Sequence, residues 1–171
     1  IENYMAAIAL VEGLATDDAI RQVARNFGGV EHRIELVRVK DGVRYYNDSI
    51  ASSPSRTIAG LRSFPEKVIL IAGGYDKHIP YDVLGPEICA HVKKLFLGGA
   101  TGPKIRAAVE NAPAYLLGMP EIVDCGDFTK ATLAAARAAE PGDVVLMSPA
   151  SAAFDQFKNF MVRGQYFKKL V

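Results

Sequence analysis

Residues 67–74 read KVILIAGG, and this stretch decides the fold. Its apolar residues follow one another without an alternating polar position, and two glycines end the run. A strand with one face in water alternates apolar and polar residues, whereas an uninterrupted apolar run indicates a strand covered on both faces. Residues 94–97, KLFL, and residues 143–147, DVVLM, have the same character. We therefore expect a sheet whose central strands are buried.

The segments around these strands are predicted to be mostly helical. Helices are expected at residues 54–63, 81–90, 101–111, 127–139 and 154–171, and a further short strand at residues 121–125. Strands that alternate with helices form a mostly parallel sheet. The predicted fold class is α/β: a Rossmann-like open, mostly parallel sheet with helices on both faces. Ligands of such sheets bind at the carboxyl ends of strands.

An initial β-hairpin is predicted upstream, because residues 33–40 and 43–47 alternate in polarity around Asp41-Gly42. Before it, residues 2–14 and 16–26 have helical patterns, the second with Thr16 as its N-cap. We therefore divide the chain into a helical remnant of another domain, residues 1–29, and an α/β domain, residues 30–171.

The start of the sequence lies inside a helical pattern and lacks a methionine. We expect the chain to be the C-terminal piece of a longer protein. With 20 basic and 19 acidic residues the net charge is +1, which gives no global reason to expect nucleic acid or a membrane as partner. Neither a signal peptide nor a membrane-spanning run is present, so a cytoplasmic location is expected. Cys89 and Cys125 lack metal-ligand spacing, and we expect buried free thiols and no metal site.

Three stretches offer candidate binding residues. Residues 45–54, YYNDSIASSP, place Asp48 between a strand and a helix, where it either caps the turn or binds a ligand. Residues 72–80, AGGYDKHIP, place Lys77 after two glycines, which serve either a tight turn or the approach of a ligand. The four phenylalanines of residues 154–167 suit one helix face and are expected mostly in the core. No Walker A or GxGxxG spacing is present.

These stretches, together with residues 32–37, HRIELV, and 146–167, LMSPASAAFDQFKNFMVRGQYF, resemble the C-terminal part of the Mur ligases, most closely the branch that adds D-glutamate. The resemblance implies an ATP- and Mg²⁺-dependent enzyme of bacterial peptidoglycan synthesis. ATP phosphorylates the carboxyl group of UDP-MurNAc-L-alanine, and the amine of D-glutamate attacks the acyl phosphate. It also implies that N-terminal and central domains are missing here, that residues 1–29 belong to the central, ATP-binding domain, and that this chain alone is inactive.

The resemblance assigns binding roles but no catalytic residue within this chain. The residues implied at ATP are Asn3, Arg33 and Asp48. The residues implied at D-glutamate are Lys77, Ser52, Phe154 and Phe160. The Mg²⁺ ligands are expected mainly in the central domain, and residues 28–32 are the expected hinge of domain closure.

Two positions depart from the family pattern. Ile50 stands where NDSKATN has a lysine, and Ala153 replaces a serine before the FDQF run. Each change removes a polar contact, for which Lys77, His78 or Arg56 is a possible substitute. Two alternatives therefore stay open: a Mur-type amide ligase with another amino-acid acceptor, and a Rossmann-like binding module without catalysis.

Overall fold

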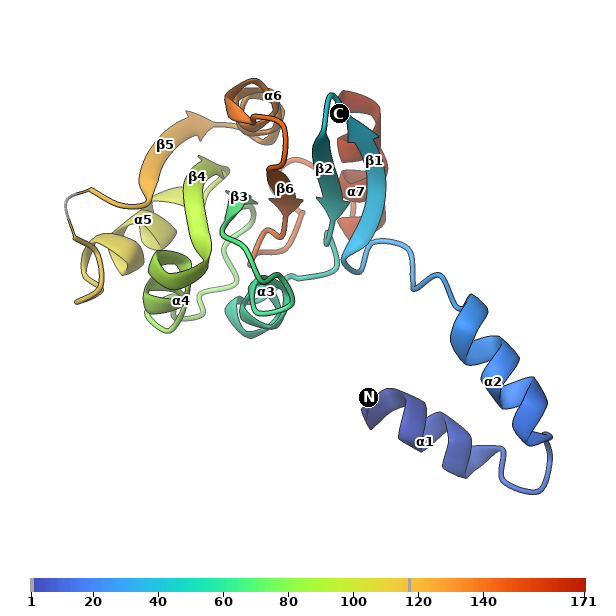
Figure 1. The fold of residues 1–171 in the computed structure, drawn as a ribbon. Coiled ribbons are helices and arrows are strands. Elements are labelled where there is room, and N and C mark those ends of the chain that lie inside the picture. Colours follow the sequence, from blue (N-terminus) through green and yellow to red (C-terminus); the bar gives the residue numbers. More distant parts are fainter. Residues whose placement is uncertain (1, 117) are drawn as a thin grey trace.

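A six-stranded, mostly parallel sheet forms the centre of the computed structural model, which describes residues 2–116 and 118–171 (Figure 1). The strand order is β1-β2-β6-β3-β4-β5, and only β1 runs antiparallel to its neighbour. The strands are β1 (Glu35–Lys40), β2 (Val43–Asn47), β3 (Val68–Ala72), β4 (Val92–Gly98), β5 (Glu121–Gly126) and β6 (Val144–Met147). On β3, Leu70 pairs with Leu95 of β4 and with Leu146 of β6. The predicted fold class is confirmed.

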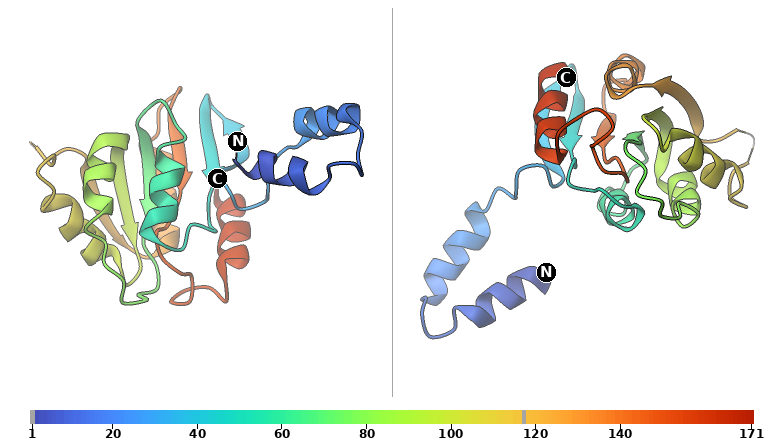
Figure 2. Two further views of the ribbon diagram at one scale, coloured as in Figure 1. Left: turned by 90° about the horizontal axis from the view of Figure 1, so that it is seen from below. Right: turned by 180° about the vertical axis from the view of Figure 1, so that it is seen from behind.

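Helices cover both faces of this sheet (Figure 2). They are α3 (Pro54–Leu61), α4 (Leu84–His91) and α5 (Gly102–Glu110) on one face, and α6 (Phe128–Ala138) and α7 (Phe160–Leu170) on the other. Strands β2 and β3 follow one another in the sequence but are not neighbours in the sheet, because β6 lies between them. As a result, the loops that follow β2, β6 and β3 leave the same edge of the sheet side by side.

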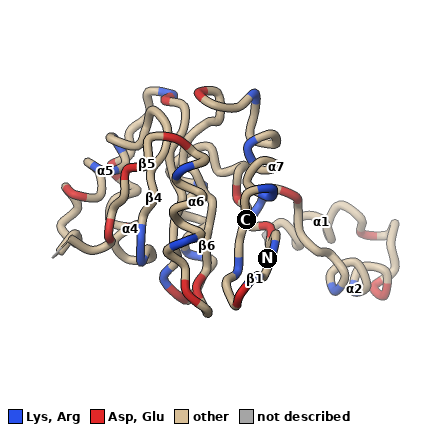
Figure 3. Tube along the Cα trace, turned by 90° about the horizontal axis from the view of Figure 1, so that it is seen from above, with Lys and Arg blue, Asp and Glu red and all other residues tan. Residues whose placement is uncertain are grey.

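Basic and acidic residues are interspersed along the trace, as Figure 3 shows. This mixture agrees with the net charge of +1 and means that an anion site must be built locally. Among the described residues, no helix has both the length and the apolar character needed to cross a membrane.

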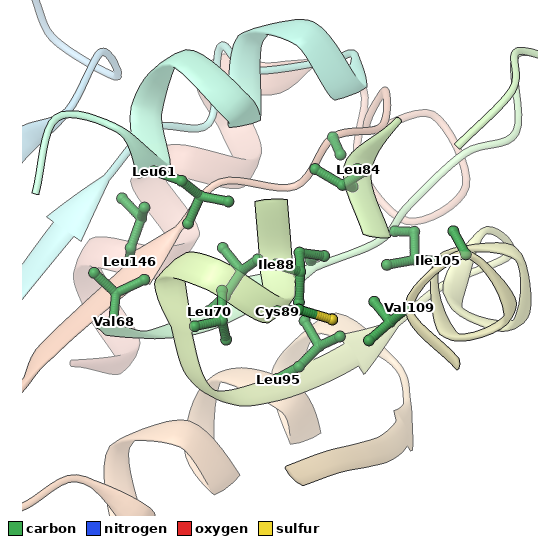
Figure 4. Close-up of a cluster of buried hydrophobic side chains, with 14 of the residues drawn as sticks. Leu61, Val68, Leu70, Leu84, Ile88, Cys89, Leu95, Ile105, Val109 and Leu146 are labelled. Atoms are coloured by element: carbon green, nitrogen blue, oxygen red, sulfur yellow. The ribbon is translucent and has the colours of Figure 1, made fainter. Parts of the chain in front are cut away.

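The larger hydrophobic core lies between the sheet and helices α3, α4 and α5 (Figure 4). Leu70 and Leu95 from the sheet pack there with Leu61, Ile88 and Ile105 from the helices, and all five are fully buried. A second hydrophobic cluster lies on the opposite face of the sheet and buries Ile69 and Ile71 of β3. Because both faces of β3 are buried, all of its residues are apolar.

Several predicted boundaries are wrong, and two of them have a clear local reason. The last helix begins at Phe160 and not at residue 154, because Asn159 is extended and caps the helix by accepting a hydrogen bond from the Val162 backbone N–H. Strand β1 begins at Glu35 and not at residue 33, since His32 and Ile34 have positive φ angles of 66° and 45°. The first helix ends at Leu10 and not at residue 14.

Helices α1 (Glu2–Leu10) and α2 (Asp17–Asn26) lie apart from the sheet and its covering helices (Figures 1 and 2). The Thr16 hydroxyl accepts a hydrogen bond from the Ala19 backbone N–H, which confirms the predicted N-cap. No residue of α2 is buried, and a groove lined by apolar residues runs between the two helices. Several large apolar side chains of this segment are exposed, among them Met5, Leu10, Leu14 and Val23.

Candidate functional site

A pocket of about 410 Å³ opens at the carboxyl end of β2, where the chain passes into α3. Its lining comes from the turn before β1, from the β2–α3 loop and from one side of α3. The lining residues are Arg33, Ile34, Asp48, Ile50, Ala51, Arg56, Ala59, Gly60 and Ser63. The sequence places functional candidates at strand ends, and this pocket lies at one of them.

Asp48 is the buried acid of this pocket, with 4% of its surface exposed. One carboxylate oxygen accepts a hydrogen bond from the Ser148 hydroxyl at 2.7 Å, and the other accepts one from the Ile34 backbone N–H at 3.3 Å. Burial raises the pKa of Asp48 to about 6, although these hydrogen bonds and the charges of Arg33 and Arg56 oppose the rise. The group is therefore mainly ionised at pH 7 and can accept hydrogen bonds from ligand hydroxyls.

The two arginines of the pocket have no side-chain hydrogen bond or ion pair among the described residues. Arg62, at the C-cap of the same helix as Arg56, by contrast pairs with Glu87. Arg56 lies in the first turn of α3, whose N-cap residue Ser53 makes no capping bond with its side chain. The pocket thus combines a buried carboxylate, two guanidinium groups and an open helix start, which suits a ligand that carries both hydroxyls and negative charge.

A polar network fixes the turn that carries Arg33. The buried His32 ring accepts a hydrogen bond at Nδ1 from the Asn47 amide at 2.9 Å, and the His32 backbone N–H donates to Glu35 at 3.0 Å. The ligand atoms of Glu31, His32 and Glu35 lie within 4.8 Å of one another. Lys168 already bridges the two carboxylates, at 2.8 and 2.6 Å, so we interpret this cluster as an ion-pair network.

A second set of candidates lies on the loops after β3 and β6. The Tyr75 backbone N–H donates to the Ala152 carbonyl at 2.9 Å, and the Tyr75 and Phe154 rings meet edge to face with centroids 5.9 Å apart. Phe154 is 64% exposed, so it does not join the core as its spacing had suggested. Lys77 is exposed on the same β3 loop, while its neighbour Asp76 pairs with Lys104 at 2.6 Å.

Close packing explains the two glycines that end β3. A Cβ atom on Gly73 would lie 1.9 Å from the Gly98 carbonyl oxygen, and one on Gly74 would lie 2.4 Å from the Ala152 carbonyl oxygen. Both glycines also have positive φ angles, 111° and 149°. They allow the loops after β3, β4 and β6 to meet backbone to backbone, which decides the open question in favour of packing.

The structure brings together some of the residues implied by the resemblance and separates others. Arg33 and Asp48 line one pocket, and Ser52 is half-buried in the loop that leads from it to α3. Phe160 packs its ring against His32 at 5.9 Å. Asn3 is exposed on α1, apart from the sheet.

Several residues of the site were not predicted. Ser148 contacts Asp48 although 100 residues separate them, and its position directly after an apolar strand was the only signal in the sequence. Gly60 leaves room beside the carboxylate, since a Cβ there would lie 3.0 Å from Asp48 Oδ2. Of the two positions that the sequence analysis noted as departures from the family pattern, Ile50 lines the pocket and Ala153 is buried.

A protein-family model described as "Mur ligase, glutamate ligase domain" matches residues 32–151, which include the pocket and most of the sheet. The chain belongs to the Mur ligase family. The resemblance noted in the sequence is thereby confirmed.

Among curated relatives of this Mur ligase chain, the UDP-N-acetylmuramoylalanine--D-glutamate ligase of Acetivibrio thermocellus is 56% identical over 173 aligned residues. The ligase of the same name from Ruminiclostridium cellulolyticum is 50% identical. Both alignments cover 100% of this chain, and the chain spans 37% of the length of these relatives.

Solved structures share the fold at low sequence identity. A folylpolyglutamate synthase from Thermotoga maritima matches with a TM-score of 0.60 and 19% identity, over 99% of this chain and 38% of its own. A murein peptide ligase from Psychrobacter arcticus matches with a TM-score of 0.56 and 14% identity, over 99% and 36%. A bifunctional folylpolyglutamate synthase/dihydrofolate synthase from Yersinia pestis, with a TM-score of 0.57, 18% identity and 91% and 34% coverage, was solved with AMPPNP and Mn.

Proposed function

We propose that this chain is the C-terminal domain of a bacterial, cytoplasmic ligase that uses ATP to join D-glutamate to UDP-MurNAc-L-alanine. The observation that carries the reaction is the 56% identity, along the whole chain, to a relative named for D-glutamate ligation. In this proposal residues 30–171 form the C-terminal domain, and residues 1–29 are a helical remnant of the central domain.

The pocket at Asp48 is the part of the nucleotide site that this domain supplies. The ionised carboxylate accepts hydrogen bonds from the ribose hydroxyls, and Arg33 and Arg56 provide positive charge for the phosphates. Asn3, on α1, completes the site from the central-domain side. The Mg²⁺ ligands and the phosphate-binding loop belong to the central domain in this proposal. The described acidic cluster of Glu31 and Glu35 beside His32 is already bridged by Lys168.

The loops after β3 and β6 form the amino-acid side of the site. Lys77 offers a cation for a D-glutamate carboxylate, and Phe154 offers an exposed ring beside Tyr75, which lies on the same loop as Lys77. Ser52 and Phe160 complete this side in our proposal. The amine of D-glutamate attacks the acyl phosphate made from the carboxyl group of UDP-MurNAc-L-alanine, and this domain orients the amine when it closes about residues 28–32.

Phosphate release by the full-length protein tests the reaction. The assay contains ATP, Mg²⁺ and UDP-MurNAc-L-alanine, with D-glutamate or another amino acid as acceptor. We expect turnover with D-glutamate and none with the 171-residue chain alone. If D-glutamate gave no turnover while another amino acid did, the proposed acceptor would be wrong.

A second candidate is a Mur-type amide ligase with a different acceptor. It is favoured by Ile50, an apolar residue in the lining of the pocket, and by Ala153, where the family pattern has a hydroxyl. The acceptor series in the same assay separates the two candidates, because each predicts a different productive amino acid.

A further inference from the structure

Arg163, in the first turn of α7, is a buried arginine without an acidic partner. Its side chain is fully covered, with 1% of the residue exposed, and no carboxylate among the described residues lies within ion-pair distance of it. Burial lowers the pKa of Arg163 to about 10, although the charge of Asp155 opposes the shift, so the group keeps its charge at pH 7. A buried charge that forms no ion pair is costly and needs hydrogen bonds to compensate.

The guanidinium group of Arg163 makes these bonds to two loops. On the loop after β2, Nε donates to the Ser49 hydroxyl at 3.1 Å and Nη2 donates to the Ser49 carbonyl at 2.9 Å. On the loop after β6, Nη2 also donates to the Ser151 carbonyl at 3.0 Å and Nη1 donates to the Ala152 carbonyl at 3.0 Å. The planar fork of one side chain therefore connects two segments that are about a hundred residues apart in the sequence.

One of the two connected loops carries Asp48 of the nucleotide side, and the other carries Phe154 of the amino-acid side. Ser49 directly follows Asp48, and Ala152 lies two residues before Phe154. The β6 loop also contains Ala150, whose φ of 55° is unusual for a residue with a side chain and needs support from its surroundings. The bonds from Arg163 to Ser151 and Ala152 supply part of that support.

We propose that Arg163 is a positioning residue that holds the nucleotide side and the amino-acid side of the site at a fixed spacing. This inference rests on the proposed function. The acceptor nitrogen and the acyl phosphate meet only if the two sides are correctly spaced, and an error of an ångström is costly in such a reaction. A lysine at position 163 would keep the charge but lacks the planar fork that reaches both loops.

The test compares Arg163→Lys with Phe167→Leu in the full-length ligase. Phe167 is a buried core residue of the same helix that lies outside the site, so its variant reports what a loss of α7 packing does by itself. Assays are run well below both melting temperatures. We expect Arg163→Lys to lower kcat/KM for ATP and for D-glutamate by roughly tenfold or more each, and Phe167→Leu to leave both values within about twofold.

The proposal is overturned if Arg163→Lys leaves both kcat/KM values within about twofold of the wild type, or changes them no more than Phe167→Leu does. If Arg163→Lys does not fold, Ser49→Ala decides, because it removes the acceptor of the Nε bond and keeps the other three bonds of Arg163. The same change also removes the hydrogen bond from the Ser49 hydroxyl to the Phe160 carbonyl. We expect it to raise the KM for ATP, and an unchanged value would overturn the proposal. If the wild type is inactive with D-glutamate, the proposed function fails. In that case the affinity of the same variants for ATP is measured by calorimetry and compared with that of the wild type.

Discussion

At the scale of single residues, the hydrogen bonds of Asp48 exclude one of the two roles that its position left open, the capping of the following turn. Both carboxylate oxygens accept hydrogen bonds from outside α3, one from Ser148 and one from the backbone before β1. The side chain therefore does not cap the helix that follows it. It faces the pocket as a buried acid, and burial makes its ionisation unfavourable in the folded protein.

The raised pKa of Asp48 predicts a pH-dependent cost to stability. Its folded-state pKa is about 6, against 3.8 for an unperturbed aspartate, so the folded protein binds the proton more tightly than the unfolded chain. Stability from this group is therefore greatest below about pH 4 and falls as the pH rises through 6, by on the order of 3 kcal/mol. We expect Asp48→Asn to gain that amount relative to the wild type between pH 4 and pH 7, measured by urea unfolding.

The comparison is made between the two proteins at each pH, so that other titrating groups cancel. Asp82→Asn, at an exposed position just before α4, is the control for the removal of any carboxylate. A difference in unfolding free energy between Asp48→Asn and the wild type that stays constant from pH 4 to pH 7 would show that burial does not perturb Asp48.

Arg56 is predicted to bind the charged part of the nucleotide. Arg56→Met in the full-length protein should weaken ATP and ADP binding by roughly 10-fold or more, since a hydrogen bond to a charged group contributes about 1.5–3 kcal/mol. Adenosine, which has no phosphate, should bind equally to both proteins. Arg137→Met is the matched control, because Arg137 is an exposed arginine of α6, on the opposite face of the sheet. Equal loss of adenosine and ATP binding would contradict a phosphate contact.

At the scale of elements, the sequence predicted the strands better than the helix starts. The apolar runs fixed β3, β4 and β6 because burial on both faces leaves no room for polar residues, and Asp41-Gly42 has the positive φ angles of a tight hairpin turn. The start of α7 was missed because the apolar spacing of residues 154–157 imitates a helix face. The decisive signal, Asn159 as N-cap, is a single residue.

The site was only partly predictable for a physical reason. Arg33 and Asp48 came from the resemblance, and the structure brings them into one pocket. The contacts of Ser148 with Asp48 and of Arg163 with Ser49 join segments about a hundred residues apart, so no local pattern reveals them. Their partners are mostly backbone or hydroxyl groups, which carry no complementary charge that a sequence could show.

Helix α7 is predicted to depend on Gly164 for its close approach to the turn before β1. A Cβ atom at this position would lie 2.2 Å from His32 Nδ1, so Gly164→Ala must displace either the helix or the buried ring. We expect a loss of about 1–3 kcal/mol in the free energy of unfolding, as overpacking usually costs.

The control for Gly164→Ala is Gly102→Ala in α5, where a Cβ would meet only Leu97 Cβ, at an ordinary 3.6 Å. This control should cost less than about 1 kcal/mol, because the higher helix propensity of alanine offsets the clash of its Cβ with the ring of the following Pro103. Urea unfolding of both variants checks the pair. Equal effects of the two substitutions would mean that α7 does not need the close contact with His32.

At the scale of the whole molecule, the chain divides into parts with unequal burial. The α/β part has one hydrophobic cluster on each face of its sheet. By contrast, Met5, Leu10 and Val23 of α1 and α2 are exposed, and no residue of α2 is buried. An exposed apolar surface of this kind is typical of a segment that is covered by another part of a larger protein. This agrees with relatives that are much longer than the chain.

This division predicts that residues 30–171 fold as stably as residues 1–171. Removal of residues 1–29 takes away no side chain that packs in either core cluster, so the free energy of unfolding should change by less than about 1 kcal/mol in urea. The shorter chain should also aggregate less, because it loses exposed apolar side chains. Leu10→Ser with Leu14→Ser in the longer chain is the control: if exposed apolar surface causes aggregation, these changes should reduce it without deleting the helices. A loss of more than about 2 kcal/mol on truncation would show that α1 and α2 support the sheet and would place the domain boundary elsewhere.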